Sequence, residues 1–240
     1  MNLYYDLHIH SCLSPCGDDD MTPANIVGMA ALKGLELIAV TDHNSCKNCP
    51  AVMELAAEYG LLAIPGMELT TSEEVHVLCL FPSLSQALAF DDYVHQHLFA
   101  IANKEHIFGK QQIYNAQDIC IDSEPLLLIN STRISIDALY PLITSFEGVM
   151  IPAHIEKNAN SLLCNLGFVP PDSKFTVVEL KDPTLLPTLC AQNPYLTQCN
   201  VLCNSDAHYL QDIKEPNEVL TVTEKSIAAV LHALQNGTIF

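Results

Sequence analysis

Short apolar, β-branched runs alternate along this chain with segments of helical periodicity. This alternation is typical of repeated βα units around a mainly parallel sheet. Strands are predicted at residues 3–9, 37–40, 61–65, 75–81, 126–130, 149–152, 177–180, 201–204 and 219–222. Their number favours an α/β fold built as a barrel of about seven or eight units. A chain of 240 residues is long enough to hold such a barrel in a single domain.

The first predicted helix has the clearest boundaries. Thr22 can cap its start, Pro23 suits its first turn, and Gly34 follows its last residue. Further helices are predicted at residues 50–59, 84–97 and 224–236, with Thr223 as the cap of the last one. Residues 98–125 show weak periodicity, and we expect this segment to decorate the barrel as an insert.

The chain is strongly acidic, with 28 Asp and Glu against 10 Lys and Arg and a formal net charge of −18. Such a charge repels phosphate backbones at long range, so the sequence predicts that nucleic acid is not a partner. Carboxylates gathered around a cavity would instead attract divalent cations, which would reverse the local sign for an anionic substrate. Neither a leader-like start nor a long apolar run is present, so a cytoplasmic protein without membrane association is expected.

Histidines recur at the ends of the predicted strands. Six of the ten lie at or just beyond the end of an apolar run, or in the loop after it: His8, His10, His43, His76, His154 and His208. The C-terminal strand ends of a parallel barrel converge on one face, so residues distant in sequence can meet there. His8 and His10 share one face of their strand, because side chains alternate with a period of two, and could bind one ion or two adjacent ions.

Carboxylates accompany these histidines. Asp42 precedes His43, Glu68 follows the third predicted strand, and Asp206 stands two residues before His208. Imidazole mixed with carboxylate, without an obligatory cysteine, suits Zn²⁺, Mn²⁺ or Fe²⁺ better than Ca²⁺. We therefore expect a metal centre on the face where the strand ends meet.

In their order along the chain, these motifs resemble those of the PHP (polymerase and histidinol phosphatase) family. The matching segments are Asp6-Leu7-His8-Ile9-His10-Ser11, Thr41-Asp42-His43-Asn44, Gly66-Met67-Glu68, Pro152-Ala153-His154 and Ser205-Asp206-Ala207-His208. The resemblance implies a distorted TIM-like (βα)7 barrel that holds two or three divalent ions and acts as a metal-dependent phosphoesterase.

The resemblance also implies which residues are ligands. Carried over position by position, they are His8, His10, His43, Glu68, His76, His154, Asp206 and His208, with Glu68 bridging two ions. One loop departs from the family pattern, because Ser14-Pro15-Cys16-Gly17-Asp18-Asp19-Asp20 stands where many relatives have Ser-Asp-Gly. Alignment backwards from Thr22-Pro23 makes Asp18 the expected ligand in this loop, with Asp19 close beside it.

The expected reaction is hydrolysis of a phosphate ester by metal-bound hydroxide, since divalent ions lower the pKa of bound water toward neutrality. Asp206 and His208 are the predicted catalytic residues for proton transfer. Phosphate also needs cationic side chains. Arg133 and Lys157 are the basic residues predicted in loops on the catalytic face, where they would bind substrate.

Several functions fit these residues. The leading hypothesis is a phosphatase for a small phosphorylated metabolite, such as a nucleotide monophosphate or a histidinol-phosphate-like ester. A nuclease or phosphodiesterase acting on oligonucleotide ends is the first alternative, against which the acidic surface and the absence of tryptophan weigh. A non-catalytic metal-binding regulatory domain is the second, because ligands do not guarantee turnover. The motif order disfavours an amidohydrolase, as does the lack of a lysine at a strand end.

The ten cysteines are expected to be reduced in a cytoplasmic protein. Cys12, Cys16, Cys46 and Cys49 lie in the loops after the first two metal motifs and could approach one another near the site. Reduced thiols without a ligand role are the leading interpretation. A further metal or redox role and an oxidative disulfide are the alternatives.

Overall fold

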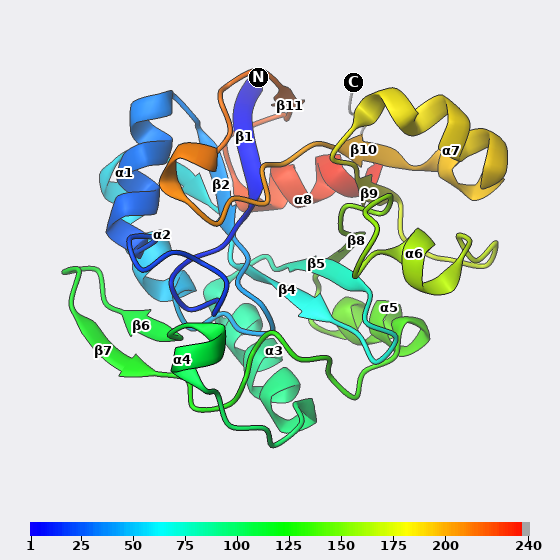
Figure 1. Ribbon diagram of the computed structural model, residues 1–240. Coiled ribbons are helices and arrows are strands. Elements are labelled where there is room, and N and C mark those ends of the chain that lie inside the picture. The colour runs from blue at the N-terminus through cyan, green and yellow to red at the C-terminus, as the bar shows by residue number, and fades with distance from the viewer. Residues whose placement is uncertain (237–240) are drawn as a thin grey trace.

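The computed structural model describes residues 1–236 and has an α/β architecture (Figure 1), which confirms the predicted fold class. Its strands are β1 (Asn2–Ile9), β2 (Leu37–Val40), β3 (Leu62–Ala63), β4 (Gly66–Thr70), β5 (His76–Leu80), β6 (Gln112–Tyr114), β7 (Cys120–Ser123), β8 (Val149–Pro152), β9 (Val177–Glu179), β10 (Asn200–Leu202) and β11 (Val219–Thr221). Its α-helices are α1 (Pro23–Lys33), α2 (Cys49–Glu58), α3 (Leu84–His97), α4 (Glu105–Phe108), α5 (Ile136–Ser145), α6 (Leu162–Leu166), α7 (Leu186–Gln192) and α8 (Ile227–Asn236). Short 3-10 helices lie at η1 (Pro183–Leu185), η2 (Pro194–Gln198) and η3 (Leu210–Asp212).

The strands form four sheets. The largest has the order β11-β1-β2-β3, in which β1, β2 and β3 run parallel and β11 pairs antiparallel with β1. The second, β4-β5-β8, is antiparallel throughout. The pair β9-β10 is parallel, and β6-β7 is an antiparallel hairpin. The strands β4, β5, β8 and β11 thus pair antiparallel where a mainly parallel sheet was predicted, which changes the direction from which residues reach the site.

Isolated contacts join these sheets without a continuous ladder. His43 forms a bridge with Glu68 between the first and second sheets, and Ile9 forms one with Ala207 in the loop after β10. The backbone N–H of Ile155 donates to the carbonyl of Glu179 at 3.0 Å and links the segment after β8 to β9. Across residues 1–236 no closed barrel is seen, so the barrel itself stays a prediction.

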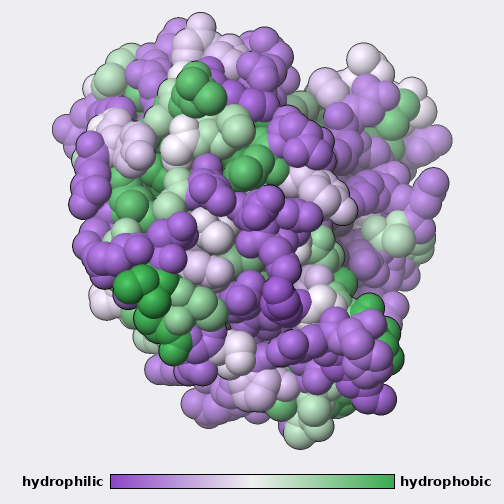
Figure 2. Space-filling view, turned by 60° about the vertical axis from the view of Figure 1, so that its left-hand side comes forward, coloured by the Kyte–Doolittle hydropathy of each residue, from purple (hydrophilic) through white to green (hydrophobic). Residues whose placement is uncertain are grey.

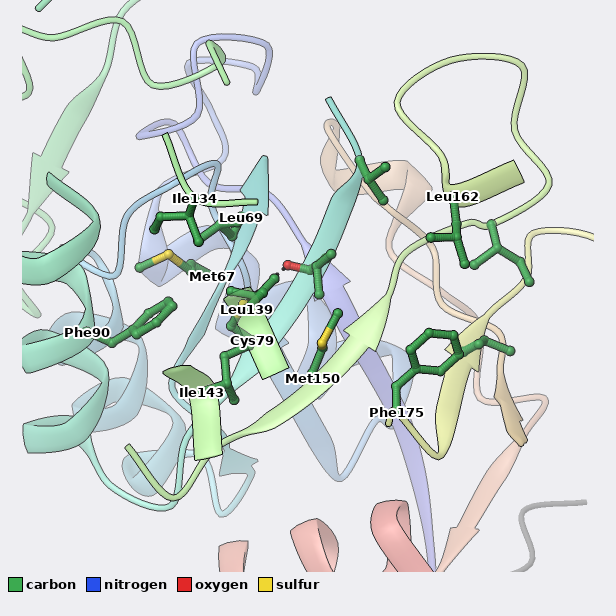
Figure 3. Packing of buried hydrophobic residues seen from close by; sticks show 14 of the residues in the cluster. Met67, Leu69, Cys79, Phe90, Ile134, Leu139, Ile143, Met150, Leu162 and Phe175 are labelled. Atoms are coloured by element: carbon green, nitrogen blue, oxygen red, sulfur yellow. Dashed lines mark hydrogen bonds between the residues drawn. The ribbon is translucent and has the colours of Figure 1, made fainter. Parts of the chain in front are cut away.

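Alternation along the strands separates several hydrophobic clusters. In β4, Met67 and Leu69 pack with Phe90 of α3 and Met150 of β8 in one hydrophobic cluster (Figure 3). A second cluster fills the space between the sheets and is covered by α8, with Leu7 of β1 among its members. A third packs α1 and α2 against β1, β2 and β3. Because side chains alternate, residues of β4 between the core positions face the other way.

Some predicted elements differ from the observed ones. Residues 126–130 form no strand, although Leu127 and Leu128 are buried. The N–H of Leu128 donates to the side chain of Gln111, so a side chain replaces the expected ladder partner. The last helix begins at Ile227, and the Oγ of Ser226 caps it by accepting from the N–H of Ala229, so the predicted start and Thr223 cap are wrong.

The segment 98–125 is more ordered than its periodicity indicated. It contains α4 and the β6-β7 hairpin, which lie together in Figure 1. The N–H of Gln112 donates to the carbonyl of Cys12 at 2.9 Å, and Gly109 lies directly against the carbonyl of Pro15. The segment therefore packs on the loop that follows β1.

Candidate metal centre

A single buried carboxylate lies at the centre of the predicted site. The oxygens of Glu68 lie between 2.9 and 3.4 Å from ring nitrogens of five histidines: His8, His10, His43, His76 and His154. Glu68 is 1% exposed. The structure thus brings together residues that span most of the sequence, as predicted from the strand ends.

The strand pattern explains how Glu68 and His76 reach this point. Glu68 alternates with Met67 and Leu69, whose side chains occupy the hydrophobic core on the other face of β4. His76 is the first residue of β5 and pairs with Thr70, because β5 runs antiparallel to β4. His76 was expected at the end of an apolar run or in the loop after it; it begins β5, and the antiparallel strand direction delivers its ring to Glu68.

His8, His10 and Asp206 form the tightest part of the cage. The Nε2 atoms of His8 and His10 are 3.1 Å apart, and each lies 3.3 to 3.4 Å from Oδ1 of Asp206. Atoms that each sit about 2.0–2.1 Å from one ion are separated by about 3.0–3.4 Å from one another. These three side chains and Glu68 therefore fit the coordination of a common divalent ion.

Buried polar atoms without hydrogen-bond partners also support the interpretation that this cluster binds divalent ions. Nδ1 of His43, Nδ1 of His154 and Oε2 of Glu68 are buried and lack such partners. Buried polar groups are normally satisfied, so unpaired ones within a cluster of potential ligands fit the binding of a cation. Ligand atoms within 4.8 Å of one another occur in three groups: His8-His10-Glu68, His43-Glu68-His76 and His10-His43-His208.

Outer carboxylates orient the ring nitrogens, and sequence reasoning missed the most important one. Both oxygens of Glu179 lie 3.0 Å from Nδ1 of His8, and Glu179 also accepts from the N–H of His154 and the amide of Asn204. Contact at Nδ1 leaves Nε2 of His8 free to bind an ion. The signal for Glu179 was present, since a carboxylate ends the apolar run at residues 177–180.

Asp42 supports His10 in a similar way but through serine. It accepts from the N–H and Oγ of Ser11 and from Oγ of Ser14, and Ser14 lies 3.0 Å from Nδ1 of His10. Asp42 is buried, and these contacts direct its carboxylate away from the histidine cluster. Its neighbour His43, the predicted ligand of this motif, instead faces the cluster, with Nδ1 3.0 Å from Oε2 of Glu68.

Two central carboxylates are held in the ionised form. Burial by itself would raise the pKa of Glu68, but the charges of His76, His8 and His43 hold that pKa well below its usual range. Burial by itself would also raise the pKa of Asp206, but the neighbouring rings of His8 and His10 lower that pKa. Ionised carboxylates at neutral pH are what a divalent ion requires as ligands.

Residues with a strained backbone conformation lie in and beside the histidine cluster. Asn44, His154 and Asp206 have positive φ values of 50°, 32° and 55°. Such conformations are unfavourable for residues other than glycine, and they cluster where surrounding contacts enforce a functional geometry. Asn44, for example, donates from Nδ2 to the carbonyls of Leu128 and Asn130.

The rim of the cage holds the predicted catalytic and substrate-binding groups. His208 stacks on His10 with ring centroids 4.4 Å apart, and its side chain is 27% exposed. Nζ of Lys157 lies 3.0 Å from Oδ2 of Asp206, and this side chain is 44% exposed. Arg133 lies farther along the surface, with its guanidinium 5.0 Å from the ring centre of Phe99. Thus Lys157 joins the cage, whereas Arg133 makes no recorded contact with it among residues 1–236.

The divergent loop presents Cys16 rather than Asp18 to the histidines. The thiol of Cys16 lies near the rings of His43 and His208. Burial alone would raise the pKa of this thiol, but the two rings lower it to about 6. The Oδ1 of Asp18 instead accepts from the N–H of Asp20 in its own turn, and Asp19 pairs with Lys110 at the surface.

The four loop cysteines do not converge as a group. Cys46 and Cys49 lie side by side in the core, each with its thiol toward the carbonyl of Gly66. Cys12 points instead toward the carbonyl of Gln112. All ten thiols are free, so Cys16 differs from the others by its position against the cage.

The surface is mixed in character. On the face shown in Figure 2, hydrophobic residues form separate patches among predominantly hydrophilic ones. Exposed apolar side chains are frequent in and beside the segment 98–125: Phe99, Ile101, Ile107, Phe108, Ile119, Ile121 and Ile129. Within residues 1–236, none of the helices has both the length and the apolar character that crossing a membrane requires.

Sequence comparison places these residues among known proteins. The PHP domain family model matches residues 6–160. An uncharacterized protein of Methanocaldococcus jannaschii is 36% identical over 76 residues, which cover 28% of this chain and 44% of that protein. The 5'-3' exoribonuclease Rnm of Salmonella typhimurium is 35% identical over 81 residues, or 32% of this chain and 27% of that protein. The chain thus spans less than half the length of these curated relatives.

Structure comparison gives a similar fold over nearly the whole chain. A crystal structure of the lesion-specific endonuclease Q from Pyrococcus furiosus has a TM-score of 0.67 and 21% identity, covering 98% of this chain and 56% of that one. A crystal structure of Endonuclease Q in complex with a 27-mer duplex substrate, with an abasic lesion at the active site, has a TM-score of 0.66 over the same shares. At this identity the likeness concerns the fold.

Proposed function

Because the chain belongs to the PHP domain family, we propose that it is a metal-dependent phosphoesterase that cleaves phosphodiester bonds of nucleic acid. The observation that carries this proposal is the convergence of five histidines on Glu68, with Asp206 beside His8 and His10. Nuclease relatives then favour nucleic acid as the substrate class.

The expectation that nucleic acid is not a partner is wrong. It rested on the net charge of −18, whereas one of the similar proteins is an exoribonuclease and another is an endonuclease solved with a DNA duplex. Net charge is a sum over the whole surface, and a phosphodiester group meets only the local field. Cations held by the cage would make that local field positive despite the acidic remainder.

The residues present fit two or three divalent ions, which would lower the pKa of bound water and neutralise charge on the phosphoryl oxygens. His8, His10, Glu68 and Asp206 would hold one ion, and Glu68, His76 and His154 would hold a second. Zinc, manganese and iron remain the candidates for this donor set.

Other side chains would act on the substrate directly. We place His208 as the group that exchanges a proton with solvent, because it is the most exposed histidine of the cage. Asp206, fixed by Lys157, would orient it, since its backbone carbonyl lies 2.8 Å from Nδ1 of His208. Lys157 would meet a phosphate at the rim, and Arg133 with Phe99 would meet a flanking nucleotide.

A small phosphate ester is the second candidate substrate. The acidic surface favours it, because only ten basic side chains are available to follow a polynucleotide backbone. We further propose that the four sheets represent a distorted, open version of the (βα)7 barrel. Their isolated bridges would be the remnants of its closure.

The test compares both substrate classes with one preparation. End-labelled single-stranded RNA, single-stranded DNA and a duplex with one abasic site would be incubated beside nucleoside monophosphates and histidinol phosphate, each with Mn²⁺, Zn²⁺ or Fe²⁺. The Asp206→Asn variant removes a cage ligand, and Asp212→Asn, an exposed residue of η3, is its matched control.

We expect shortened oligonucleotides with the native protein and with Asp212→Asn, but not with Asp206→Asn. Phosphate release from small esters alone would overturn the nucleic-acid assignment in favour of the second candidate. An absence of hydrolysis in every metal-loaded reaction would overturn the enzymatic proposal and leave a metal-binding regulatory domain.

A further inference from the structure

Asn48 connects the segment 98–125 to the metal centre. Its side chain is fully buried and lies directly before α2. Its Oδ1 accepts from the N–H of Tyr114 at 2.9 Å, and its Nδ2 donates to the carbonyl of Gln112 at 3.2 Å. Both of these backbone groups belong to β6, so the carboxamide binds this strand as a neighbouring strand would.

The same amide begins a chain of buried hydrogen bonds that ends at His10. Nδ2 of Asn48 also donates to Oγ of Ser11 at 2.8 Å, and Oγ of Ser11 donates to Oδ2 of Asp42 at 2.6 Å. Oγ of Ser14 donates to Oδ1 of Asp42 at 2.7 Å and lies 3.0 Å from Nδ1 of His10. All five side chains are 2% exposed or less, so water does not compete for these hydrogen bonds.

The proton positions in this chain follow from its donors and acceptors. The carboxylate of Asp42 only accepts, so both serine hydroxyls direct their protons toward it. Oγ of Ser14 can then only accept, from the N–H of His43 at 3.1 Å and from Nδ1 of His10. Nδ1 of His10 therefore carries the proton, which leaves the lone pair of Nε2 for an ion.

We propose that Asn48 is a positioning residue for His10 and that it couples the hairpin β6-β7 to the metal affinity of the cage. Asn48 holds the hydroxyl of Ser11 toward Asp42. Asp42 in turn orients the hydroxyl of Ser14, on which the ring of His10 depends. The inference rests on the metal centre of the proposed function, with His10 as a ligand, but not on its substrate.

The hairpin also packs directly on the loop that carries the two serines. Ile113 of β6 is 9% exposed and lies in one hydrophobic cluster with Leu13, the residue between Cys12 and the second serine. The N–H of Gln112 donates to the carbonyl of Cys12 at 2.9 Å. A shift of β6 therefore displaces both this loop and the amide of Asn48.

The test measures the Zn²⁺ affinity of the full chain by competition with a chelator. In Asn48→Asp, a carboxylate keeps the shape of the side chain but has no proton to donate, so the hydrogen bonds to Ser11 and to the carbonyl of Gln112 are lost. Ser14→Ala breaks the chain beside His10 and gives the second background for a double-mutant cycle.

Asn193→Asp is the matched control. Asn193 is also buried, accepts from the N–H of Val169 at 2.9 Å and donates to the carbonyl of Leu189 at 3.4 Å. Its carboxamide thus makes the same kinds of hydrogen bond to backbone as that of Asn48, and its two partners lie outside the cage.

We expect the Zn²⁺ affinity to fall about tenfold in Asn48→Asp and about 10- to 100-fold in Ser14→Ala, as for other groups that orient metal ligands, and to change less than about twofold in Asn193→Asp. Adding Asn48→Asp to Ser14→Ala should cost less than about a further twofold, because the connection to His10 is already broken. Losses that multiply in the double variant would overturn the proposal. Native affinity in Asn48→Asp, or an equal loss in Asn193→Asp, would do the same.

Ile113→Ala tests the hairpin end of this connection. It loosens β6 from Leu13, so we expect an affinity loss of about threefold that disappears in the Ser14→Ala background. Ile121→Ala, at an exposed position of β7, is the control and should match native protein. An unchanged affinity in Ile113→Ala would overturn the coupling of the hairpin to the metal centre.

A measurement on native protein guards against misfolded variants. In metal-free protein with ¹⁵N-labelled histidine, NMR distinguishes a ring nitrogen that carries a proton from one that does not. We expect the proton of His10 on Nδ1, and a proton on Nε2 in its place would overturn the proposal. Native protein that binds no Zn²⁺ would overturn this proposal together with the metal centre, whereas Zn²⁺ binding without hydrolysis of any substrate overturns the proposed function alone.

Discussion

The inner and outer halves of the cage are built differently. The inner half consists of His8, His10, Glu68 and His76, which are 6% exposed or less, and β1, β4 and β5 or the residue directly after β1 carry them. The outer half consists of Cys16, Asp206 and His208, which lie on loops, together with Lys157 at the rim. Strand positions are rigid and loop positions depend on a few anchoring contacts, so we expect the inner half to define metal binding and the outer half to define selectivity.

Of the substitutions that distinguish the inner from the outer half, removing the carboxylate of Glu68 should have the largest effect on metal binding and activity. In Glu68→Gln, five histidines lose their common anion. Because outer-shell changes alone cost 10–100-fold in affinity or activity, we expect a loss of roughly 1,000-fold in activity and of most bound metal. Metal analysis and hydrolysis rates would be compared with Glu58→Gln, an exposed residue of α2. Near-native metal content in Glu68→Gln would contradict a central role for this residue.

The orienting carboxylate should have the next largest effect. In Glu179→Gln, an amide group replaces one of the oxygens that contact Nδ1 of His8 and the N–H of His154. His8 then loses a partner that holds its Nε2 toward the ion, and we expect a 10- to 100-fold weaker metal affinity, as is typical of such partners. Competition with a chelator measures this affinity. An unchanged affinity would show that Glu179 serves packing alone.

The reactivity of Cys16 tests the outer half in the metal-free protein. Because His43 and His208 lower its pKa to about 6, the thiolate is already the dominant form at neutral pH. Raising the pH from about 7 to about 9 should therefore change its alkylation rate less than about twofold, whereas a free thiol with a pKa near 8.5 gains roughly 20-fold. Peptide mapping gives the rate at Cys16, and glutathione is the reference. A rate that rises in parallel with glutathione would contradict the lowered pKa.

Lys157 should affect substrate binding more than turnover. Lys157→Met removes a half-exposed ammonium beside Asp206, so we expect KM to rise about tenfold with a smaller change in kcat. Lys174→Met, an exposed lysine remote from the cage in sequence and contacts, is the control. A fall in kcat at constant KM would instead place Lys157 in the chemical step.

Arg133 should have the smallest effect, and one that depends on the substrate. Its guanidinium lies over Phe99, and within the described residues 1–236 it makes no contact with the cage. Arg133→Ala should lower cleavage of oligonucleotides by roughly threefold through lost stacking and leave a small phosphate ester unaffected. An equal loss on both substrates would mean that Arg133 contacts the reacting phosphate itself.

Much of the cage was predictable from local sequence. His8, His10, His43, Glu68, His154, Asp206 and His208 lie together, as motif order and strand ends indicated. Helix 84–97 has the predicted boundaries, because Ser83 caps it and the periodicity is sustained. The strand predicted from the apolar run at 126–130 is wrong, since a buried loop has the same short apolar pattern as a buried strand.

The predictions that differ from the structure concern features whose position depends on contacts between segments far apart in the chain. Alignment predicts Asp18 as the ligand of its loop, but the contacts that fix the loop path are made by the carbonyl of His208 and the hydroxyl of Ser14. Local sequence does not indicate the role of Glu179, because its partner, His8, is 171 residues away. The net charge indicated the wrong partner class, because a sum over the surface carries no information about the field inside a cavity.

The sequence by itself determined the alternation that turns Glu68 away from Met67 and Leu69 and places His8 and His10 on one face. That alternation follows from covalent geometry, which each strand carries within itself. Only the tertiary structure decided that an antiparallel β5 brings His76 to Glu68, and that Cys16 and not Asp18 faces His43 and His208. Strand direction and loop path depend on hydrogen bonds and close contacts between segments far apart in the chain, such as Gly17 against Ser11 and Asp18 against His208.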